Sequence, residues 1–120
     1  MKILIVDDSK AMRLIVSRTL RQAGFDGYAL EEATNGLEGL AAVRRGAPDL
    51  VLSDWNMPEM TGIEFLEALG KEPFAGKFCF VTSESTDDMR ERAKAAGATA
   101  FITKPFTADV FRETLTPLFV

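Results

Sequence analysis

The sequence predicts an α/β fold built from five βα units, in which a doubly wound parallel sheet is covered by helices on both faces. Short runs rich in Val, Ile and Phe alternate five times with amphipathic stretches, and residues suited to capping a helix stand where these stretches begin. Linkers rich in Ser and Gly, repeats and low-complexity segments are absent. The length of 120 residues suits one core, so we expect a single domain over residues 1–120.

The five apolar runs are the predicted strands. Each run is continuous rather than alternating, so we expect all five strands to be buried on both faces. The runs are Ile3–Val6, Tyr28–Leu30, Leu50–Leu52, Phe78–Val81 and Ala100–Ile102.

A helix is predicted after each strand. In the first helix, apolar and small residues recur at helical spacing from Met12 to Ala23 and include Ile15, so we expect one continuous buried stripe that ends at Gly24. The later helices begin at residues with capping chemistry. These expected caps are Asn35 with Glu38, Thr61 with Glu64, Ser85 with Asp88, and Thr107. Pro117 lacks an amide hydrogen and is expected to interrupt the last helix.

Composition and charge argue against several classes of function. The chain has no histidine, which excludes His-based metal sites, His–Asp triads and a phosphohistidine within this chain. Its formal net charge of −4 argues against direct binding to the phosphate backbone of nucleic acid. No apolar run approaches the ~20 residues that a membrane span needs. The single cysteine, Cys79, fits a reducing compartment such as the cytoplasm.

Polar side chains follow the predicted strands at the edge where parallel sheets bind ligands. The residues after the first, third, fourth and fifth strands are Asp7 and Asp8, then 53–56, then 82–84, then 103–105. Glu31 and Glu32 follow the second strand less regularly.

This set of side chains indicates a magnesium-dependent phosphorylation site. Asp7, Asp8 and Asp54 repel one another unless a cation lies among them, and the single ammonium of Lys104 neutralises only part of their charge. Carboxylate oxygens suit Mg²⁺, which completes its ligand shell with water and phosphate. Asp54 is then the expected nucleophile, because carboxylates form aspartyl-phosphates. Lys104 and the hydroxyl of Thr82 would spread the phosphoryl charge.

Each of these residues also has an ordinary structural explanation. Asp7 or Asp8 could cap the first helix, and Asp54 could begin a turn. Thr82 and Lys104 could be simple strand-end and loop residues. Four such coincidences at four strand ends of one sheet favour a site.

The same motifs resemble those of bacterial response-regulator receiver domains. The matching residues are Asp7-Asp8, Asp54-Trp55-Asn56-Met57-Pro58, Met60, Gly62, Thr82-Ser83-Glu84 and Lys104-Pro105-Phe106. The resemblance runs from the first strand to the fifth helix and is strongest to the single-domain chemotaxis regulators of the CheY type. It implies a flavodoxin-like, CheY-like sheet with strand order 2-1-3-4-5.

The resemblance also implies a role for each site residue. Asp54 resembles the phosphoacceptor. Asp7, Asp8, Asp54 and the backbone carbonyl of Asn56 resemble the ligands of Mg²⁺. Lys104 would bind the phosphoryl oxygens, and Thr82 would donate a hydrogen bond to the attached phosphoryl group.

Four further positions resemble residues that tune or relay the switch. Asn56 and Glu84 stand two residues after the phosphoacceptor and the threonine, where the family controls access of the hydrolytic water. Phe101 takes a position that is often Tyr in chemotaxis members, so it lacks the hydroxyl. The peptide bond before Pro105 is typically cis in the family.

A receiver domain implies protein partners. A sensor histidine kinase would donate the phosphoryl group, and an output protein would bind the face formed by the fourth helix, fifth strand and fifth helix. We expect a monomer with no membrane insertion and no direct contact with nucleic acid. Leu14 lies opposite the apolar stripe of the first helix, beside Arg18 and Arg21. It is either an isolated surface leucine or a contact for the kinase.

The leading hypothesis is therefore a phosphorylation switch in chemotaxis that catalyses only its own phosphorylation and dephosphorylation. One alternative is a receiver cut from a larger regulator. Another is a Mg²⁺-dependent phosphohydrolase, but such enzymes need Asp-x-Asp after the first strand, where this chain has Asp7-Asp8-Ser9. A flavodoxin-like cofactor carrier would need a hydroxyl- and glycine-rich loop at the same place, and this chain lacks one.

Overall fold

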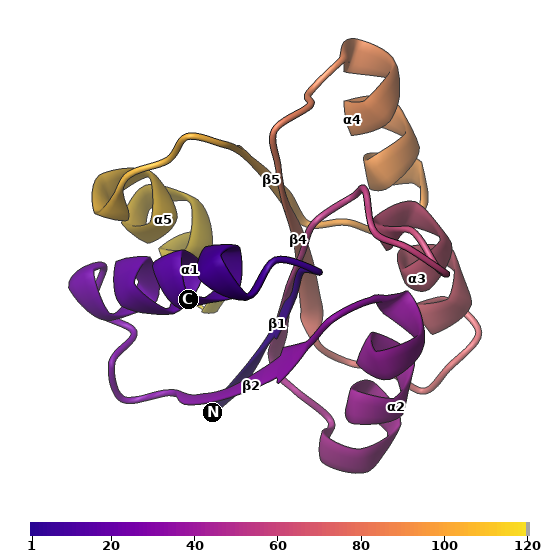
Figure 1. The fold of residues 1–120 in the computed structure, drawn as a ribbon, viewed down its shortest axis with the longest axis horizontal. Helices are drawn as coiled ribbons and strands as arrows, with labels where there is room; N and C mark the ends of the chain where they lie inside the picture. The colour runs from indigo at the N-terminus through magenta and orange to yellow at the C-terminus, as the bar shows by residue number, and fades with distance from the viewer. Residues whose placement is uncertain (120) are drawn as a thin grey trace.

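The computed structural model describes residues 1–119 and contains the five predicted βα units (Figure 1). The strands are β1 (Lys2–Val6), β2 (Ala29–Ala33), β3 (Leu50–Ser53), β4 (Lys77–Thr82) and β5 (Ala100–Thr103). The helices are α1 (Lys10–Gln22), α2 (Gly36–Gly46), α3 (Gly62–Leu69), α4 (Asp87–Ala95) and α5 (Ala108–Leu115), and a 3₁₀ turn, η1 (Thr116–Phe119), follows them. All strand pairs are parallel, in the order β2-β1-β3-β4-β5. The predicted fold class and strand order are confirmed.

Helices cover both faces of the sheet. Figure 1 shows α1 and α5 on one face and α2, α3 and α4 on the other. Alternate residues of β1 point to opposite faces of the sheet. Ile3 and Ile5 lie in the core under α1 and α5, and Leu4 and Val6 lie in the core under the other three helices. The inner strands are therefore buried on both faces, as their continuous apolar runs predict.

The two edge strands correct the expectation of burial on both faces. In β2 only Ala33 is buried, and in β5 only Ile102 is buried. Glu31 and Glu32, expected after the second strand, lie within β2 and pair in register with residues of β1. The physical reason is that an edge strand has a neighbour on one side only, so its side chains reach solvent and nearby cations. Glu31, for example, forms ion pairs with Lys2 and Arg45.

Most of the predicted helix ends are confirmed. Asn35, Thr61 and Thr107 each accept a hydrogen bond from a backbone N–H of the first helical turn, and Thr61 forms a complete capping box with Glu64. The expected cap of the fourth helix is wrong by one residue. Thr86, not Ser85, accepts from the backbone N–H of Met89. Ser85 and Thr86 are adjacent and both carry a hydroxyl that can cap a helix, so the sequence alone does not distinguish them.

The buried face of α1 is narrower than predicted. Val16 and Leu20 are buried, whereas Ile15 is 46% exposed. Ile15 lines a groove between α1 and the β5–α5 loop, so part of its side chain faces solvent. Gly24 ends the helix as expected, with the positive φ of 101° that glycine tolerates.

The α-helical conformation ends at Leu115 and a 3₁₀ turn that contains Pro117 follows, which agrees with the expected interruption by this residue. Phe119 packs against the aromatic rings of Phe25 and Tyr28, so the described part of this segment covers the core under α1. None of the helices within residues 1–119 is long and apolar enough to cross a membrane.

Candidate functional site

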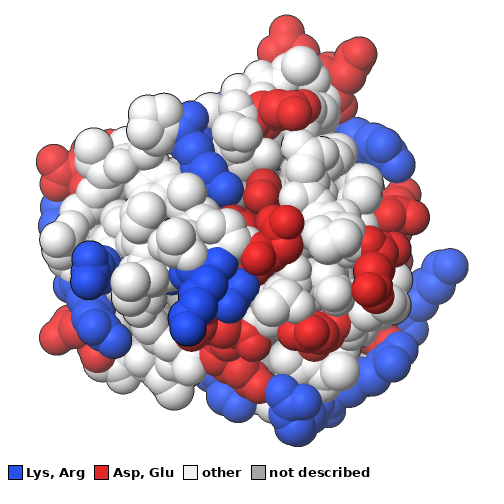
Figure 2. All heavy atoms as spheres, in the orientation of Figure 1, with Lys and Arg blue, Asp and Glu red and all other residues white. Residues whose placement is uncertain are grey.

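An acidic site lies at the carboxyl ends of the inner strands. Asp7 follows β1 and is almost fully buried, Asp8 is exposed, and Asp54 follows β3 and is partly buried. One carboxylate oxygen from each of the three lies within 4.8 Å of the others. Figure 2 shows acidic side chains gathered in the middle of this face, with basic side chains beside them. The structure thus brings together the three aspartates predicted as metal ligands.

Asp7 is held from several sides at the end of β1. Its backbone N–H donates to Ala33 of β2, and its carboxylate accepts a hydrogen bond from the backbone N–H of Ser9 at 2.9 Å. Ser9 caps α1 by accepting from the backbone N–H of Met12. Neither Asp7 nor Asp8 is therefore the cap of α1, and that alternative explanation of the two aspartates is wrong.

Asp54 is positioned by the close return of the chain after β3. Its backbone N–H donates to Val6 of β1, and its carboxylate accepts from the backbone N–H of Trp55 at 2.7 Å. At the start of α3, Gly62 donates its N–H to Trp55 at 2.8 Å. A Cβ atom at Gly62 would lie 2.1 Å from the backbone oxygen of Asp54, so only glycine permits this approach.

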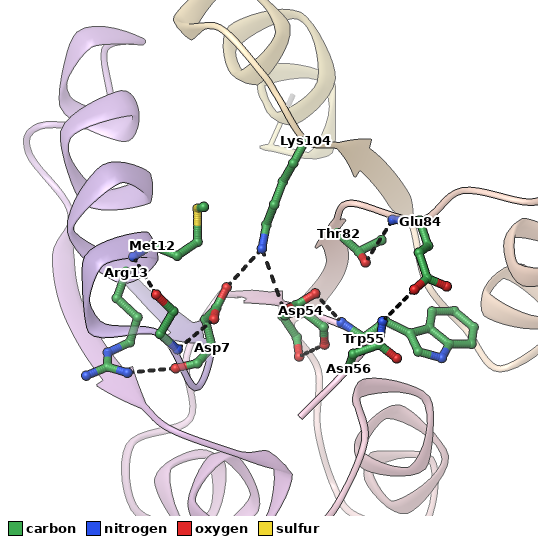
Figure 3. A network of polar contacts seen from close by, with 11 residues as sticks. Asp7, Met12, Arg13, Asp54, Trp55, Asn56, Thr82, Glu84 and Lys104 are labelled. Atoms are coloured by element: carbon green, nitrogen blue, oxygen red, sulfur yellow. Dashed lines mark hydrogen bonds and ion pairs between the residues drawn. The ribbon is translucent and has the colours of Figure 1, made fainter. Parts of the chain in front are cut away.

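Lys104 links the two halves of the acidic site. Its ammonium lies 3.2 Å from Oδ2 of Asp7 and 3.5 Å from Oδ2 of Asp54 (Figure 3). The Lys104 side chain is 16% exposed, so these ion pairs are shielded from solvent more than surface pairs are. The peptide bond between Lys104 and Pro105 is cis, as the family resemblance implies.

The environment of Asp54 changes its acidity. Burial raises the pKa of the Asp54 carboxyl above its usual range, and the nearby charge of Asp7 acts in the same direction. The ammonium of Lys104 acts in the opposite direction but does not cancel the rise in that pKa. A partly desolvated carboxylate beside a cation is a suitable nucleophile, because fewer waters must be removed before an electrophile approaches.

The two tuning residues meet beside the site. Asn56 and Glu84 are both exposed, and the side-chain amide of Asn56 donates to a carboxylate oxygen of Glu84 at 3.2 Å (Figure 3). Thr82, at the end of β4, is fully buried, and its hydroxyl accepts from the backbone N–H of Glu84 at 3.4 Å. The contact of Asn56 with Glu84 therefore joins the loop after β3 to the loop after β4, beside Asp54 and Thr82.

Aromatic rings connect this site with α4 and β5. Trp55 lies 4.8 Å from Phe80, and Phe80 lies 5.8 Å from Phe101, measured between ring centroids. The guanidinium carbon of Arg90 lies 4.6 Å from the centroid of the Phe101 ring, and Arg90 donates to the hydroxyl of Thr103 at 3.1 Å. Phe101 is therefore held in a partly exposed position by a cation from α4.

Sequence reasoning missed the contacts of two arginines. The contact of Arg90 with the Phe101 ring was not predicted, and Arg13 was not singled out. Arg13 donates to the backbone oxygen of Asp7 at 2.7 Å and to Glu32 of β2 at 2.8 Å. The charge of Arg13 could have indicated these contacts. A cation close to the N-terminal end of a helix is unfavourable, so an acceptor for it was to be expected nearby.

The arrangement fits a divalent cation and a phosphoryl group. Three carboxylates converge and share one ammonium, which leaves excess negative charge for a metal ion to neutralise. An anion attached to Asp54 would meet the ammonium of Lys104 directly. These residues can therefore bind a metal and accept a charged group at one carboxylate.

Comparison with known proteins agrees with this reading of the fold and the site. The family model of the response regulator receiver domain matches residues 3–116. The chain is 40% identical to the chemotaxis protein CheY of Pseudomonas aeruginosa, over 99% of this chain and 96% of that protein. It is 39% identical to the chemotaxis protein CheY-3 of Vibrio cholerae, over 99% of this chain and 92% of that protein. The crystal structure of the Vibrio cholerae chemotaxis protein CheY4 superposes with a TM-score of 0.87 at 37% identity, over 98% of both chains. This chain belongs to the family of response regulator receiver domains.

Proposed function

We propose that this chain is a phosphorylation-dependent switch of chemotaxis signalling in the cytoplasm, and that residues 1–120 form one receiver domain. One observation carries the proposal: Asp7, Asp8 and Asp54 converge within 4.8 Å beside the ammonium of Lys104. The relatives that match nearly the whole chain are named as chemotaxis proteins, which supports the pathway.

Mg²⁺ is the proposed metal. Asp7, Asp8, Asp54 and the backbone carbonyl of Asn56 would hold it, since hard oxygen ligands suit this ion. When bound, Mg²⁺ would shield Asp54 from an approaching anion and polarise the phosphoryl group.

The chain's own side chains would complete the reaction at Asp54. The carboxylate of Asp54 attacks the phosphorus of the donor, and the bond from phosphorus to the leaving group breaks. Lys104 binds the phosphoryl oxygens, and the hydroxyl of Thr82 donates a hydrogen bond to one of them. Asn56 and Glu84, joined by their hydrogen bond, limit the approach of the water that later removes the group. The chain thus promotes only its own phosphorylation and dephosphorylation.

A phosphohydrolase acting on outside substrates fits this chain less well. Such enzymes need a second aspartate two residues after the first, where this chain has Ser9. Ser9 is occupied as the cap of α1.

Two protein partners complete the proposal. A sensor histidine kinase donates the phosphoryl group, and an output protein binds the face of α4, β5 and α5 when Asp54 is phosphorylated. The chain itself acts as a monomer and contacts neither nucleic acid nor membrane directly.

Magnesium is expected to stabilise the protein, because it relieves repulsion among Asp7, Asp8 and Asp54. At a hundredfold excess over its dissociation constant, Mg²⁺ should add about 2.7 kcal/mol to the free energy of unfolding, which corresponds to a rise of roughly 10 °C in the melting temperature. Differential scanning calorimetry with and without Mg²⁺ measures this rise. Trp55, which adjoins Asp54, should report the same binding by its fluorescence.

Asp8→Asn is the matched variant for this measurement. It removes a charged ligand while keeping the size of the side chain, so it should need more Mg²⁺ for the same rise. A melting temperature that does not respond to millimolar Mg²⁺ in the wild-type protein would contradict the metal site.

Leu14→Glu is expected to slow phosphoryl transfer from the histidine kinase by roughly tenfold, the effect of losing a central interface contact. Leu14 is 50% exposed, and the neighbouring Ile15 borders the apolar groove between α1 and the β5–α5 loop. Lys104 of the acidic site lines the same groove, and a phosphohistidine of the kinase must approach Asp54 beside it. Transfer is measured by mixing phosphorylated kinase with this chain and following the phosphoryl mass over time.

A small acyl phosphate provides the internal control, because it needs no docking surface and should label Leu14→Glu at the wild-type rate. Leu37→Glu is the matched variant, since Leu37 of α2 is 48% exposed but lies in the other helical layer. Equal slowing of Leu14→Glu with both donors would show a folding defect rather than a lost contact.

A further inference from the structure

Arg13 links three elements behind the acidic site. Its Nη1 atom donates to the backbone oxygen of Asp7 at 2.7 Å, and its Nε atom donates to a carboxylate oxygen of Glu32 at 2.8 Å. Figure 3 shows the guanidinium turned back from α1 toward Asp7. The Arg13 side chain is 12% exposed. It therefore ties α1 to the β1–α1 turn and to the edge strand β2.

The charge of Arg13 is unfavourable for its own helix. The N-terminal end of a helix carries a partial positive charge, and acidic residues are favoured there. The first turn of α1 has no acidic residue, and it contains Lys10. Arg13 follows directly and adds a second cation at this end. The carboxylate of Glu32 compensates the charge of Arg13. The hydrogen bond to the backbone oxygen of Asp7 attaches Arg13 to the acidic site.

The two aspartates of this turn are fixed in different ways. The carboxylate of Asp7 accepts from the backbone N–H of Ser9 and from the ammonium of Lys104. Asp8 is exposed, and none of the hydrogen bonds or ion pairs found within residues 1–119 involves its side chain. The direction of the Asp8 side chain thus depends on the backbone that precedes it, and that backbone is anchored at the carbonyl held by Arg13.

We propose that Arg13 is a positioning residue for metal binding, which holds the β1–α1 turn so that Asp8 faces Asp7 and Asp54. The inference rests on the proposed function, because it assumes that this turn binds Mg²⁺. Arg13 donates to a backbone oxygen and to Glu32, so it occupies no carboxylate oxygen of the three aspartates and does not compete with the metal for them. Residues that hold a metal ligand in place without touching the metal commonly have a large effect on the affinity of the site for the metal.

Electrostatics and positioning predict opposite effects of removing Arg13. A guanidinium close to a cation site repels the cation, so loss of its charge alone would make Mg²⁺ bind more tightly. Loss of the anchor for the turn would let Asp8 move away and make Mg²⁺ bind more weakly. The sign of the change in the Mg²⁺ dissociation constant therefore distinguishes the two roles.

The experiment compares Arg13→Met with Lys10→Met in the full chain. Methionine keeps the apolar stem of either residue and removes every donor and the charge. Mg²⁺ is titrated by calorimetry and by Trp55 fluorescence. Arg13→Met should raise the dissociation constant roughly tenfold. Lys10→Met, which removes a cation from the same turn without touching Asp7, should leave the dissociation constant unchanged or lower it.

A second measurement separates positioning from a wider role. At saturating Mg²⁺, labelling of Arg13→Met by a small acyl phosphate should recover to within about twofold of the wild-type rate, because only metal affinity was lost. Unchanged or tighter Mg²⁺ binding by Arg13→Met would overturn the inference, and so would labelling that fails to recover at any Mg²⁺ concentration. If the wild-type chain itself does not bind Mg²⁺, the proposed function fails instead.

Discussion

Asp54→Asn is expected to reduce phosphorylation of the chain by a small acyl phosphate to background. Asparagine keeps the shape of the side chain, but its amide oxygen is a far weaker nucleophile than a carboxylate. Asp54 is also the carboxylate at the end of β3, and the ammonium of Lys104 lies 3.5 Å from its Oδ2 atom, close enough to bind a phosphoryl group attached there. Intact-protein mass spectrometry with Mg²⁺ present should show one added phosphoryl group on the wild-type chain and none on the variant.

The control for Asp54→Asn is Asp26→Asn. Asp26 is exposed in the loop between α1 and β2 and forms no ion pair within the described residues. Its variant should be labelled as fully as the wild type. If Asp54→Asn is labelled to the same extent, Asp54 is not the phosphoacceptor and another carboxylate carries the group.

The inner strands and most helix starts were predictable because their signals are local. A continuous apolar run marks a strand covered on both faces, and the spacing of Thr61 and Glu64 marks a capping box wherever the helix later packs. The edge strand β2 was not predictable in the same way. Whether Glu31 and Glu32 lie in a strand or after it depends on which strand pairs with them and which residues cover them. The sequence around these two residues determines neither.

The site was predictable where topology alone brings residues together. Parallel strands end at one edge of a sheet, so Asp7, Asp54, Thr82 and Lys104 had to converge once the strands were placed. Contacts that depend on side-chain direction were not predictable. The hydrogen bond between Arg13 and Glu32 joins residues 19 positions apart, and the position of Arg90 over Phe101 depends on how α4 packs on β5.

We expect phosphorylation of Asp54 to act on the face of α4, β5 and α5 through Thr82 and Phe101. Thr82 is fully buried at the end of β4, the strand that also carries Phe80, and the Phe80 ring lies 5.8 Å from that of Phe101. A hydroxyl drawn toward a new phosphoryl group leaves space behind it, and we expect the partly exposed Phe101 ring to move inward in response. The ring has no hydroxyl to bury unpaired, so this movement costs less than it would for tyrosine. Arg90 opposes it by holding the ring in its partly exposed position.

Thr82→Ala is therefore expected to separate phosphorylation from its effect on α4, β5 and α5. Labelling of Asp54 should remain largely intact, because the ammonium of Lys104 still binds the phosphoryl oxygens. The output partner should bind the wild-type chain about 5–150-fold more tightly on activation, the usual range of such coupling, and this gain should nearly vanish in the variant. Beryllium trifluoride with Mg²⁺ supplies the stable activated state for both chains.

Two readouts make this test independent of any one partner. Amide NMR shifts of α4 and β5 should respond to beryllium trifluoride in the wild-type chain and stay near their resting values in Thr82→Ala, while shifts around Asp54 change in both. Thr82→Ser keeps the hydroxyl and loses only a methyl group, so it should retain most of the remote response. A Thr82→Ala chain that shows the full remote shifts and the full gain in affinity would mean that the signal bypasses this hydroxyl. The β5–α5 loop, whose Lys104 contacts Asp54 directly, would then be the next candidate for the coupling.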